Sequence, residues 1–419
     1  MNKVKSQFTS KQKYVIALLA LTQFTVILDF MVMSPLGDFL IKSLNISTTQ
    51  FGFAVSCYAF SAGISGLLTA GFADRYDRKK LLLFFYVGFI VGTFLCGIAP
   101  SYPLLIAARI ITGLFGGVIG SIGFAIITDL FDLQHRGRVM GFVQMGFAAS
   151  QVLGIPIGIY IANKFDWHAP FLMIVVLAFI IAFMIYKKLP PIIDHLTKGH
   201  DRNVVEHFVH VFTNPKYRLG FIATSILATG GFMMMPFGSA FAINNLKVTS
   251  NHLPIIFMAS GLSSLIIMPV IGKLSDKFDR FKIFAFGSLW GMIFIMIYTH
   301  LGPSPLSVII PLNICVFIGI MSRMIPVSTI GSAVPALPDR GAYMSINASI
   351  QQIAGGLAAA FAGMIVHQKD KFSPLENYPM LGFITSFMML ITIYLVYLLN
   401  NQVKGNKATS PEPPVVLLE

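Results

Sequence analysis

Long apolar stretches alternate with short polar stretches along almost the whole chain. Each apolar stretch reaches roughly 20 residues, the length that a helix needs to cross about 30 Å of hydrocarbon. The pattern predicts twelve membrane-spanning helices, with a longer polar segment between the sixth and the seventh. The predicted spans lie near residues 14–37, 50–70, 81–99, 103–128, 139–162, 168–187, 219–243, 253–271, 283–301, 305–329, 342–366 and 379–400.

A short charged pattern recurs between the second and third spans of each half. Asp74-Arg75-Tyr76-Asp77-Arg78 reads acid, base, aromatic, acid, base, and Asp276-Lys277-Phe278-Asp279-Arg280 repeats this order about half a chain later. Two unrelated charged turns are the alternative interpretation. The shared order favours a duplicated chain, and internal repeats of this kind are common in transporters. The predicted fold is an all-α integral membrane protein made of two six-helix bundles related by pseudo-two-fold symmetry.

The composition also indicates a membrane protein. Hydrophobic residues make up 55% of the chain and charged residues only 11%, whereas a soluble domain carries about 25% charged residues. The Pro-containing C-terminal end is predicted to be disordered. The predicted organisation is a cytoplasmic N-terminus (1–13), a first bundle (14–187), a cytoplasmic linker (188–218), a second bundle (219–400) and a disordered tail (401–419).

Lys and Arg are concentrated on one side of the predicted membrane. Basic residues accumulate on the cytoplasmic side of membrane proteins, so both termini are predicted to be cytoplasmic. The net charge of +13 then faces the anionic lipid of the cell's inner (plasma) membrane, and no nucleic-acid partner is predicted. In this orientation the basic residues of the outer loops are only Lys42, Lys164, Lys247, Lys369 and Lys371.

The linker contains one segment with the pattern of a surface helix, at residues 204–212. His207 and His210 are three residues apart and can share a helix face, so a metal site is one interpretation. The interpretation we prefer is an amphipathic helix that lies at the membrane surface.

The ten residues from Ala70 to Lys79 match a known family signature, G-x-L-a-D-R-x-G-R-K, between helices two and three. From about Tyr14 to Asn400 the chain resembles the major facilitator superfamily, and within it the twelve-helix drug:proton antiporter branch that includes arabinose-efflux and nucleoside-efflux proteins. Ala70 and Asp77 replace two glycines of the signature, and Asp279 stands at the later glycine position of the second copy. The resemblance implies the family's fold, while the local backbone of the turn stays open.

The resemblance also implies that the charged turn is a conformational latch. Asp74 would lie near the start of helix eleven, and Arg78 would pair with Asp129 at the cytoplasmic end of helix four. Helix ends carry unsatisfied backbone groups and partial charges that such residues can neutralise. The alternative is that the charges only keep the loop on the cytoplasmic side. The predicted latch, which would hold the outward-open state, consists of Asp74, Arg75, Arg78, Asp129, Asp276 and Arg280.

Two charged residues in the first half fall well inside predicted spans, away from the span ends. Asp29 is the only carboxylate placed well inside any span, and Arg109 lies within helix four. An arginine inside a span costs at least about 2.5 kcal/mol, so it needs polar surroundings. The segment Arg109–Gly113 resembles the family's R-x-x-x-G, and this resemblance supports Asp29 and Arg109 as proton-coupling residues. A structural ion pair is the alternative.

Helix five carries Gly154, Pro156 and Gly158 in a G-x-P-x-G arrangement. Glycines let helix backbones approach closely, and the proline removes a hydrogen bond and permits a bend. The motif resembles the glycine- and proline-rich helix of antiporters, in the form seen in sugar-efflux relatives, and favours antiport over symport. Small-residue packing alone is the alternative.

Polar and aromatic residues inside the spans are candidates for a substrate cavity. Buried amides need hydrogen-bond partners, which are each other, water or a ligand. Gln144 and Gln151 are seven residues apart and Asn347 and Gln351 are four apart, so each pair can share a helix face. Arg323 has no acid inside a span of its own half and needs an anionic substrate group or helix dipoles. The predicted substrate-binding residues are Gln23, Phe24, Tyr58, Gln144, Gln151, Asn313, Arg323, Asn347 and Gln351, with Phe232 and Gln352 as further candidates.

The sequence contains no nucleotide-binding loop, metal motif or catalytic triad, which argues against an enzyme and against ATP as the energy source. We predict a monomeric, proton-coupled exporter of small molecules such as drugs, sugars or nucleosides. It would work by alternating access, with the proton gradient as its energy source and no cofactor. A proton-coupled uptake permease and a non-transporting membrane receptor or lipid-handling protein are the alternatives.

Overall fold

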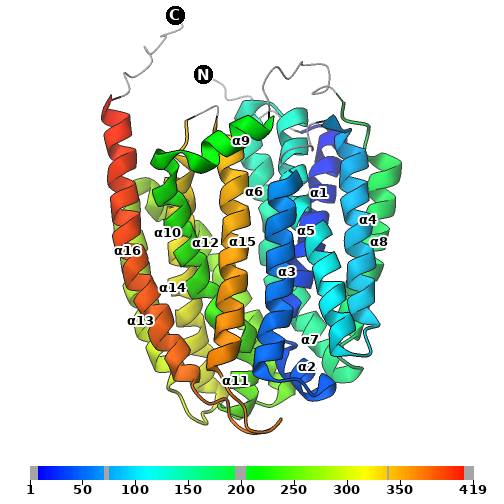
Figure 1. Cartoon of the computed structure of the whole chain (residues 1–419), viewed down its shortest axis with the longest axis vertical. Helices are drawn as coiled ribbons and strands as arrows, with labels where there is room; N and C mark the ends of the chain where they lie inside the picture. Colours follow the sequence, from blue (N-terminus) through cyan, green and yellow to red (C-terminus); the bar gives the residue numbers. More distant parts are fainter. Residues whose placement is uncertain (1–7, 70–74, 194–203, 337–338, 410–419) are drawn as a thin grey trace, which may run out of the picture.

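The computed structural model describes residues 8–69, 75–193, 204–336 and 339–409. Within these ranges, 12 helices are long and apolar enough to cross a membrane. They stand side by side in one bundle (Figure 1). The prediction of an all-α protein with twelve spanning helices is confirmed.

The first half contains six spanning segments, two of which are interrupted. The first consists of α1 (Ser10–Val32) and the short α2 (Gly37–Leu44), and the fifth changes into a π-helical turn midway. The elements are α1, α2, α3 (Thr48–Thr69), α4 (Arg78–Gly97), α5 (Tyr102–Leu130), α6 (Leu133–Ala149), the π-helical turn (Ser150–Gly154), α7 (Ile155–Lys164) and α8 (Ala169–Lys188).

The second half repeats this arrangement after a surface helix, α9 (Val204–Thr213). Its first segment is interrupted at the same place, by a 3₁₀ turn (Met235–Phe237). The elements are α10 (Pro215–Met234), α11 (Gly238–Asn244), α12 (Leu253–Lys277), α13 (Arg280–Thr299), α14 (Leu306–Ser332), α15 (Arg340–Ile365) and α16 (Tyr378–Thr409). The two interruptions fall at Pro35-Leu36-Gly37 and Pro236-Phe237-Gly238. Proline has no N–H to donate and disfavours the helical conformation in the residue before it.

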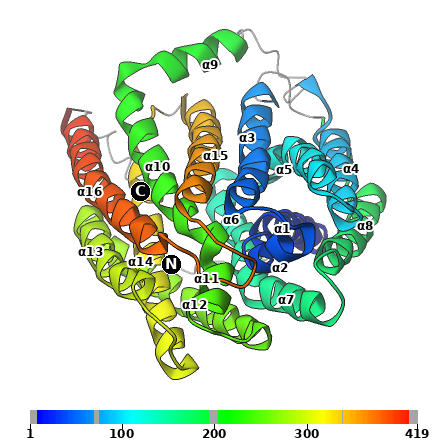
Figure 2. The ribbon, with the colours of Figure 1, turned by 60° about the horizontal axis from the view of Figure 1, so that its bottom comes forward.

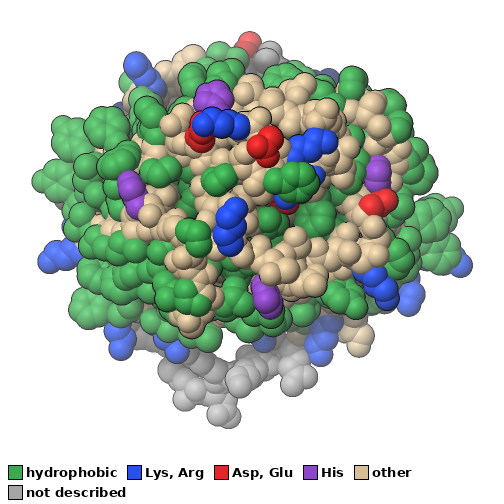
Figure 3. Space-filling view, turned by 90° about the horizontal axis from the view of Figure 1, so that it is seen from below, with side chains coloured by type: hydrophobic (Ala, Val, Ile, Leu, Met, Phe, Trp, Pro, Cys, Tyr) green, Lys and Arg blue, Asp and Glu red, His purple; other side chains and the backbone are tan. Residues whose placement is uncertain are grey.

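The two ends of the bundle differ, and we name them by the elements they carry. The terminal face is the end where α1 begins and α16 ends, and α9 lies across it (Figure 1). The far face is the opposite end, where α2 and α11 lie. Charged and histidine side chains gather over the middle of the far face, while hydrophobic side chains dominate its edge (Figure 3).

The two halves meet along two seams. Helix α3 of the first half packs on α15 of the second, and α7 with the π-helical turn packs on α12 (Figure 2). In the first seam Ser56 Oγ donates to the carbonyl of Gly356 at 2.7 Å, and Thr49 Oγ1 donates to the carbonyl of Gly363 at 2.8 Å. These contacts lie in the half of the seam that is nearer the far face.

Polar contacts also hold α2 against the second half at the far face. Asp38 Oδ1 accepts a hydrogen bond from Asn244 Nδ2 at 2.7 Å, while Lys42 Nζ pairs with Asp38 Oδ2 at 2.7 Å. Ser34 Oγ donates to the carbonyl of Met235, and Ser239 Oγ donates to the carbonyl of Ser34 at 2.7 Å. The halves are therefore joined firmly at the far face.

Gly52 allows the closest approach in the first seam. A Cβ atom there would lie 2.7 Å from the carbonyl oxygen of Ala359 and 3.1 Å from Cα of Gly363. Both are backbone atoms, so only separation of α3 from α15 relieves the clash. We expect Gly52→Val to open the far face, seen as a longer distance between spin labels at Gln50→Cys and Lys369→Cys. Phe53→Val, at a neighbouring side chain that is 49% exposed, is the control, and identical distance distributions in all three proteins would contradict the prediction.

The aspartates that replace the signature's later glycine are helix caps in both halves. Asp77 precedes α4 with φ −54° and ψ 121°, and Asp279 precedes α13 with φ −59° and ψ 121°. Each carboxylate accepts from the backbone N–H two residues on, that of Lys79 or Phe281. This geometry needs no positive φ, and it explains why an N-capping residue can replace glycine.

Both caps also bind the end of the sixth helix of their own half. Asp77 Oδ1 accepts a hydrogen bond from the backbone N–H of Ile192 at 3.0 Å, just after α8. Asp279 Oδ2 accepts one from Lys404 Nζ at 2.6 Å, near the end of α16. The repeated acid therefore ties helix three to helix six in each bundle.

The Lys404 ammonium holds the pKa of Asp279 below its ordinary value, helped by the backbone N–H of Phe281 and opposed by burial. A carboxyl group whose pKa is lower in the folded than in the unfolded protein stabilises the fold at pH values above its ordinary pKa. This stabilisation is lost as the pH falls through the lowered pKa. The pair is largely exposed, so we expect it to contribute at most about 1 kcal/mol.

Asp279→Asn keeps a capping side chain but removes the ion pair, so it is expected to speed hydrogen exchange at residues 399–405 at pH 6. The difference from the wild type should shrink as the pH falls through the lowered pKa of Asp279. A difference that stays the same throughout an acid titration would contradict this account.

Three predicted boundaries are wrong. Helix α1 begins at Ser10 rather than residue 14, because Thr9 and Gln12 form a reciprocal capping box. Helix α10 begins at Pro215, inside the predicted linker, because Asn214 caps it. Helix α16 continues to Thr409, where a disordered tail had been predicted from residue 401. Lys404 is paired with Asp279, which helps to hold this extension in place.

The predicted surface helix is present as α9, which packs on the terminal face of the second half. Phe208 and Val211 contact an apolar cluster that includes Tyr217 and Tyr343. His207 Nε2 lies 3.7 Å from Asp339 Oδ1, at the start of α15. Helix α9 thus connects the linker to the second half.

Candidate functional site

The two buried charges of the first half form an ion pair. Arg109 Nη1, on α5, lies 2.9 Å from Asp29 Oδ2, on α1, and both side chains are 0% exposed. Thr93 Oγ1, on α4, donates a hydrogen bond to Asp29 Oδ1 at 3.1 Å. Three helices thus position the carboxylate. Asp29 and Arg109 were predicted from the sequence, whereas Thr93 was not.

Arg109 is only partly satisfied in this position. Its guanidinium lies over the ring of Tyr58, with 4.4 Å between Cζ and the ring centroid. Nε and Nη2 are buried and have no hydrogen-bond partner among the described residues. A buried charge with unpaired donors is costly, so the pair can gain from any rearrangement that admits water or a polar group.

A row of aromatic rings leads from this pair to the second half. The Tyr58 ring centroid is 5.2 Å from that of Phe30, which in turn is 5.6 Å from that of Phe232 on α10. Ring pairs at this spacing are in van der Waals contact. Because Phe30 follows Asp29 directly in the chain, a shift of α1 at the ion pair changes the packing around Phe232.

Phe232 lines a cavity of about 260 Å³ between the halves. The cavity lies nearer the terminal face than the hydrogen bonds of the first seam. Its walls come from α3 and α5 of the first half and from α10 and α15 of the second. The lining residues are Ala62, Gly66, Gly117, Ser121, Ala228, Phe232, Ser345, Ala348, Ser349, Gln351 and Gln352.

Only some of the predicted substrate-binding residues line this cavity. Gln351 does, as do the further candidates Phe232 and Gln352. Asn347 accepts a hydrogen bond from Thr224 within the second half. Asn313 accepts one from Ser260 at 2.9 Å.

The other candidates have different surroundings. Gln144 is exposed. Gln151 is buried in the π-helical turn, and its Oε1 has no hydrogen-bond partner within the part of the chain that the structure describes. Gln23 lies near Gly120, and the backbone of Phe24 accepts a hydrogen bond from Ser150. Arg323 Nη2 donates to Thr392 Oγ1 at 2.9 Å.

The small side chains of the cavity were not predicted from the sequence. Ser345, Ser349 and Gln352 lie at positions i, i+4 and i+7 of α15, so they share one face of that helix. Such a polar stripe on an apolar helix was a usable signal. Ala and Gly positions carry no comparable signal, because they occur on every face of these helices.

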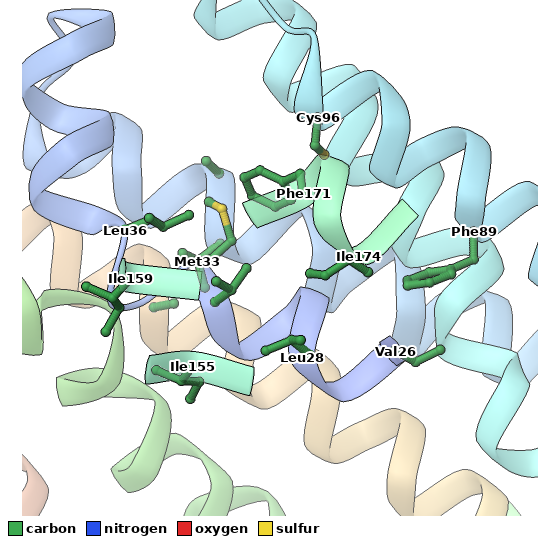
Figure 4. Packing of buried hydrophobic residues seen from close by; sticks show 14 of the residues in the cluster. Val26, Leu28, Met33, Leu36, Phe89, Cys96, Ile155, Ile159, Phe171 and Ile174 are labelled. Carbon is green, nitrogen blue, oxygen red and sulfur yellow. The ribbon is translucent and has the colours of Figure 1, made fainter. Parts of the chain in front are cut away.

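The helix-five motif brings that helix against α1 close to Asp29. Pro156 has no N–H to donate, and the helix widens into the π-helical turn just before it. A Cβ atom at Gly154 would lie 2.6 Å from Leu28 Cδ1, and one at Gly158 would lie 3.2 Å from Val32 Cγ2. Figure 4 shows Leu28, Ile155 and Ile159 in the apolar cluster between these helices.

Part of the predicted latch lies within the described residues. Arg78 Nε pairs with Asp129 Oδ2 at 3.0 Å, which is the predicted contact. Arg75 is exposed and Arg280 begins α13. Asp276 lies within α12, but its side chain, like the whole of Asp74, lies outside the described residues. The latch itself stays a prediction.

Comparisons with known proteins agree with this architecture. The sequence pattern of the Major Facilitator Superfamily matches residues 19–359. The chain is 28% identical over 261 residues to the uncharacterized MFS-type transporter YceJ of Bacillus subtilis (strain 168), covering 62% of this chain and 66% of that protein. It is 26% identical over 274 residues to AraJ of Escherichia coli (strain K12), covering 65% and 68% respectively. The alignments thus span about two thirds of these relatives' lengths.

A solved structure shares the fold. The crystal structure of a D-xylose-proton symporter superposes with a TM-score of 0.77 over 94% of this chain and 99% of that one, at 17% identity. Relatives and structural neighbours are membrane transporters rather than enzymes. The chain belongs to the Major Facilitator Superfamily and is a multi-pass membrane protein.

Proposed function

We propose that this protein is a proton-coupled exporter that works by alternating access. The observation that carries the proposal is the Asp29–Arg109 pair, fully buried and joined by Tyr58 and Phe30 to the cavity residue Phe232. A buried carboxylate can take up a proton when its surroundings change, because burial favours the neutral form and a nearby guanidinium favours the charged form. Motion of α1 links that change to the cavity.

The arrangement of the halves gives the proposed cycle its starting state. The excess of basic residues supports a cytoplasmic terminal face, in the inner (plasma) membrane. The hydrogen bonds across the first seam and at Asp38 then close the outer side, which supports an inward-facing state as the starting point of the proposed cycle. The predicted latch around Arg78 and Asp129 would act in the opposite, outward-open state.

Helix five supports antiport over symport in this proposal. Its π-helical turn and glycines let α6 and α7 pack tightly against α1, while Gly261 of α12 packs on Gln151 across the second seam. One helix thus contacts both the proton-site helix and the other half. We propose that the protein works as a monomer and that the proton gradient is its only energy source.

Proton movement in proteoliposomes tests the proposal and its alternatives. The purified protein is reconstituted with a pH-sensitive dye inside, and sugars, nucleosides and drugs are added outside one at a time. An antiporter exchanges the entering substrate for protons, so the lumen becomes more alkaline. A symporter, as in an uptake permease, makes the lumen more acidic. The absence of any response that exceeds the response of protein-free vesicles, for every compound, would favour a receptor or lipid-handling role.

A further inference from the structure

We infer that the substrate is an uncharged amphipathic molecule, with hydroxyl groups on one side and an apolar ring or chain on the other. The inference rests on the proposed transport function and specifies the ligand of the same cavity. It follows from the distribution of polar atoms in the cavity wall, from the positions of the buried charges, and from one unsatisfied amide.

The cavity has one polar wall and one apolar wall. The polar groups come mainly from α15, where Ser345, Ser349 and Gln352 share a face with Gln351 beside them. The wall formed by α3, α5 and α10 is mainly apolar: beside Ser121 it consists of Ala62, Gly66, Gly117, Ala228 and Phe232. A ligand that is polar all round would leave donors unpaired against this wall, and a purely apolar ligand would leave the serines and amides unpaired.

The described residues that line the cavity include no Asp, Glu, Lys, Arg or His. The buried charges of the spans are engaged elsewhere. Arg109 pairs with Asp29, and Arg323 donates to Thr392 on α16 and lies 5.4 Å from the ring centroid of Phe284 on α13. A charged ligand would lose its hydration in the cavity without gaining a counter-ion.

Gln352 supplies the specific recognition element. Its Oε1 is buried and has no hydrogen-bond partner among the described residues, although the side chain lines the cavity. Rotation about the last side-chain torsion can bring either end of the amide to a ligand. A hydroxyl group both donates and accepts, so it can pair with the oxygen or the nitrogen of Gln352 and with Ser345 or Ser349.

Three matched probes test the inference by binding to the purified protein in detergent. Phenyl β-D-glucopyranoside is uncharged and has a ring beside its hydroxyl groups. Phenyl β-D-glucuronide carries a carboxylate in place of one hydroxymethyl group, and phenyl 2-amino-2-deoxy-β-D-glucopyranoside carries an ammonium group. We expect the uncharged probe to bind at least about tenfold more tightly than either charged probe. At equal concentration it should therefore raise the melting temperature more, because a ligand that binds the folded state more tightly stabilises it more.

A variant of Gln352 tests whether this side chain contributes to binding of the uncharged probe. Gln352→Met keeps the length of the side chain and removes the amide, so the uncharged probe should bind about tenfold more weakly, as for the loss of one or two hydrogen bonds. Thr385→Val is the control, because Thr385 Oγ1 is also buried without a partner among the described residues, but the residue does not line the cavity. It should bind the probe as the wild type does.

The outcomes separate this inference from the proposed function. A charged probe that binds as tightly as the uncharged one, no binding of any probe, or unchanged affinity in Gln352→Met would each overturn the inference. None of these measurements involves a proton gradient, so they do not depend on coupling. Failure of proton coupling would instead appear as probe binding without any pH response in vesicles.

Discussion

Asp29→Leu is expected to lower the free energy of unfolding by about 3–5 kcal/mol, the usual cost of breaking a buried ion pair from one side. The variant removes the carboxylate partner of the Arg109 guanidinium, which is 0% exposed in the wild-type protein. Two nitrogens of this guanidinium already lack hydrogen-bond partners among the residues that the structure describes. Arg109→Met should cost less, because a carboxylate left alone in the span can become neutral by taking up a proton. Reversible unfolding in mixed micelles, or melting temperatures in one detergent, would measure both losses.

The double variant Asp29→Leu/Arg109→Met provides the decisive comparison. It removes both charges and leaves apolar side chains of similar size, so it should recover much of the stability lost in Asp29→Leu. Thr93→Val is the matched control, because it removes one hydrogen bond to Asp29 and should cost about 1 kcal/mol. Additive losses in the double variant would mean that the two charges do not stabilise one another.

The sequence was enough to find this pair but not its geometry. Asp29 and Arg109 stood out because charges inside apolar spans are rare, and periodicity then placed them on helices one and four. Their contact could not be predicted from the pattern, because the residues of an apolar helix do not indicate which neighbouring helix each face contacts. Thr93 was missed for the same reason, because threonines are frequent in these spans.

The cavity shows the same limit more sharply. Gln144 and Asn347 looked equally suitable as ligand-binding amides, yet one is exposed and the other bonds to Thr224. An amphipathic soluble helix reveals its buried face through its polar side, whereas a spanning helix is apolar on both its lipid and its protein faces. Helix α15 carries enough polar residues, such as Ser345 and Ser349, for one face to be recognised.

The duplication of the fold could be predicted more completely from the sequence than the candidate site. The charged turns predicted two equivalent halves, and Asp77 and Asp279 proved to be caps with matching backbone angles. A second repeat, Pro35-Leu36-Gly37 with Pro236-Phe237-Gly238, interrupts the first helix of each half. Repeats are readable because local backbone chemistry, such as capping or a proline break, depends on a few adjacent residues.

Asp29→Asn is expected to abolish pH-driven transport while leaving substrate exchange intact. Asparagine has nearly the volume of aspartate and can still accept a hydrogen bond from Thr93, so the packing around α1 should be kept. It imitates the protonated carboxyl group and cannot release a proton. Substrate movement down its own gradient needs only the conformational cycle, whereas uphill movement needs the carboxylate to load and unload.

The measurement uses proteoliposomes and any compound that gives a pH response with the wild-type protein. Under a pH gradient, uphill accumulation by Asp29→Asn should fall to the level of protein-free vesicles. Without a gradient, exchange of labelled for unlabelled substrate should continue. Asp279→Asn, which changes a partly exposed carboxylate at the terminal face, should keep both activities and controls for the loss of any acid.

Full pH-driven accumulation by Asp29→Asn would remove the central pair from the coupling mechanism. Among the described residues, Asp38 is the other carboxylate buried in the bundle, and it bonds to Asn244 across the far face. Protonation there would weaken the contact between α2 and α11 rather than the Asp29–Arg109 pair. Coupling would then act by opening the far face, and Asp38→Asn would be the variant that loses uphill transport.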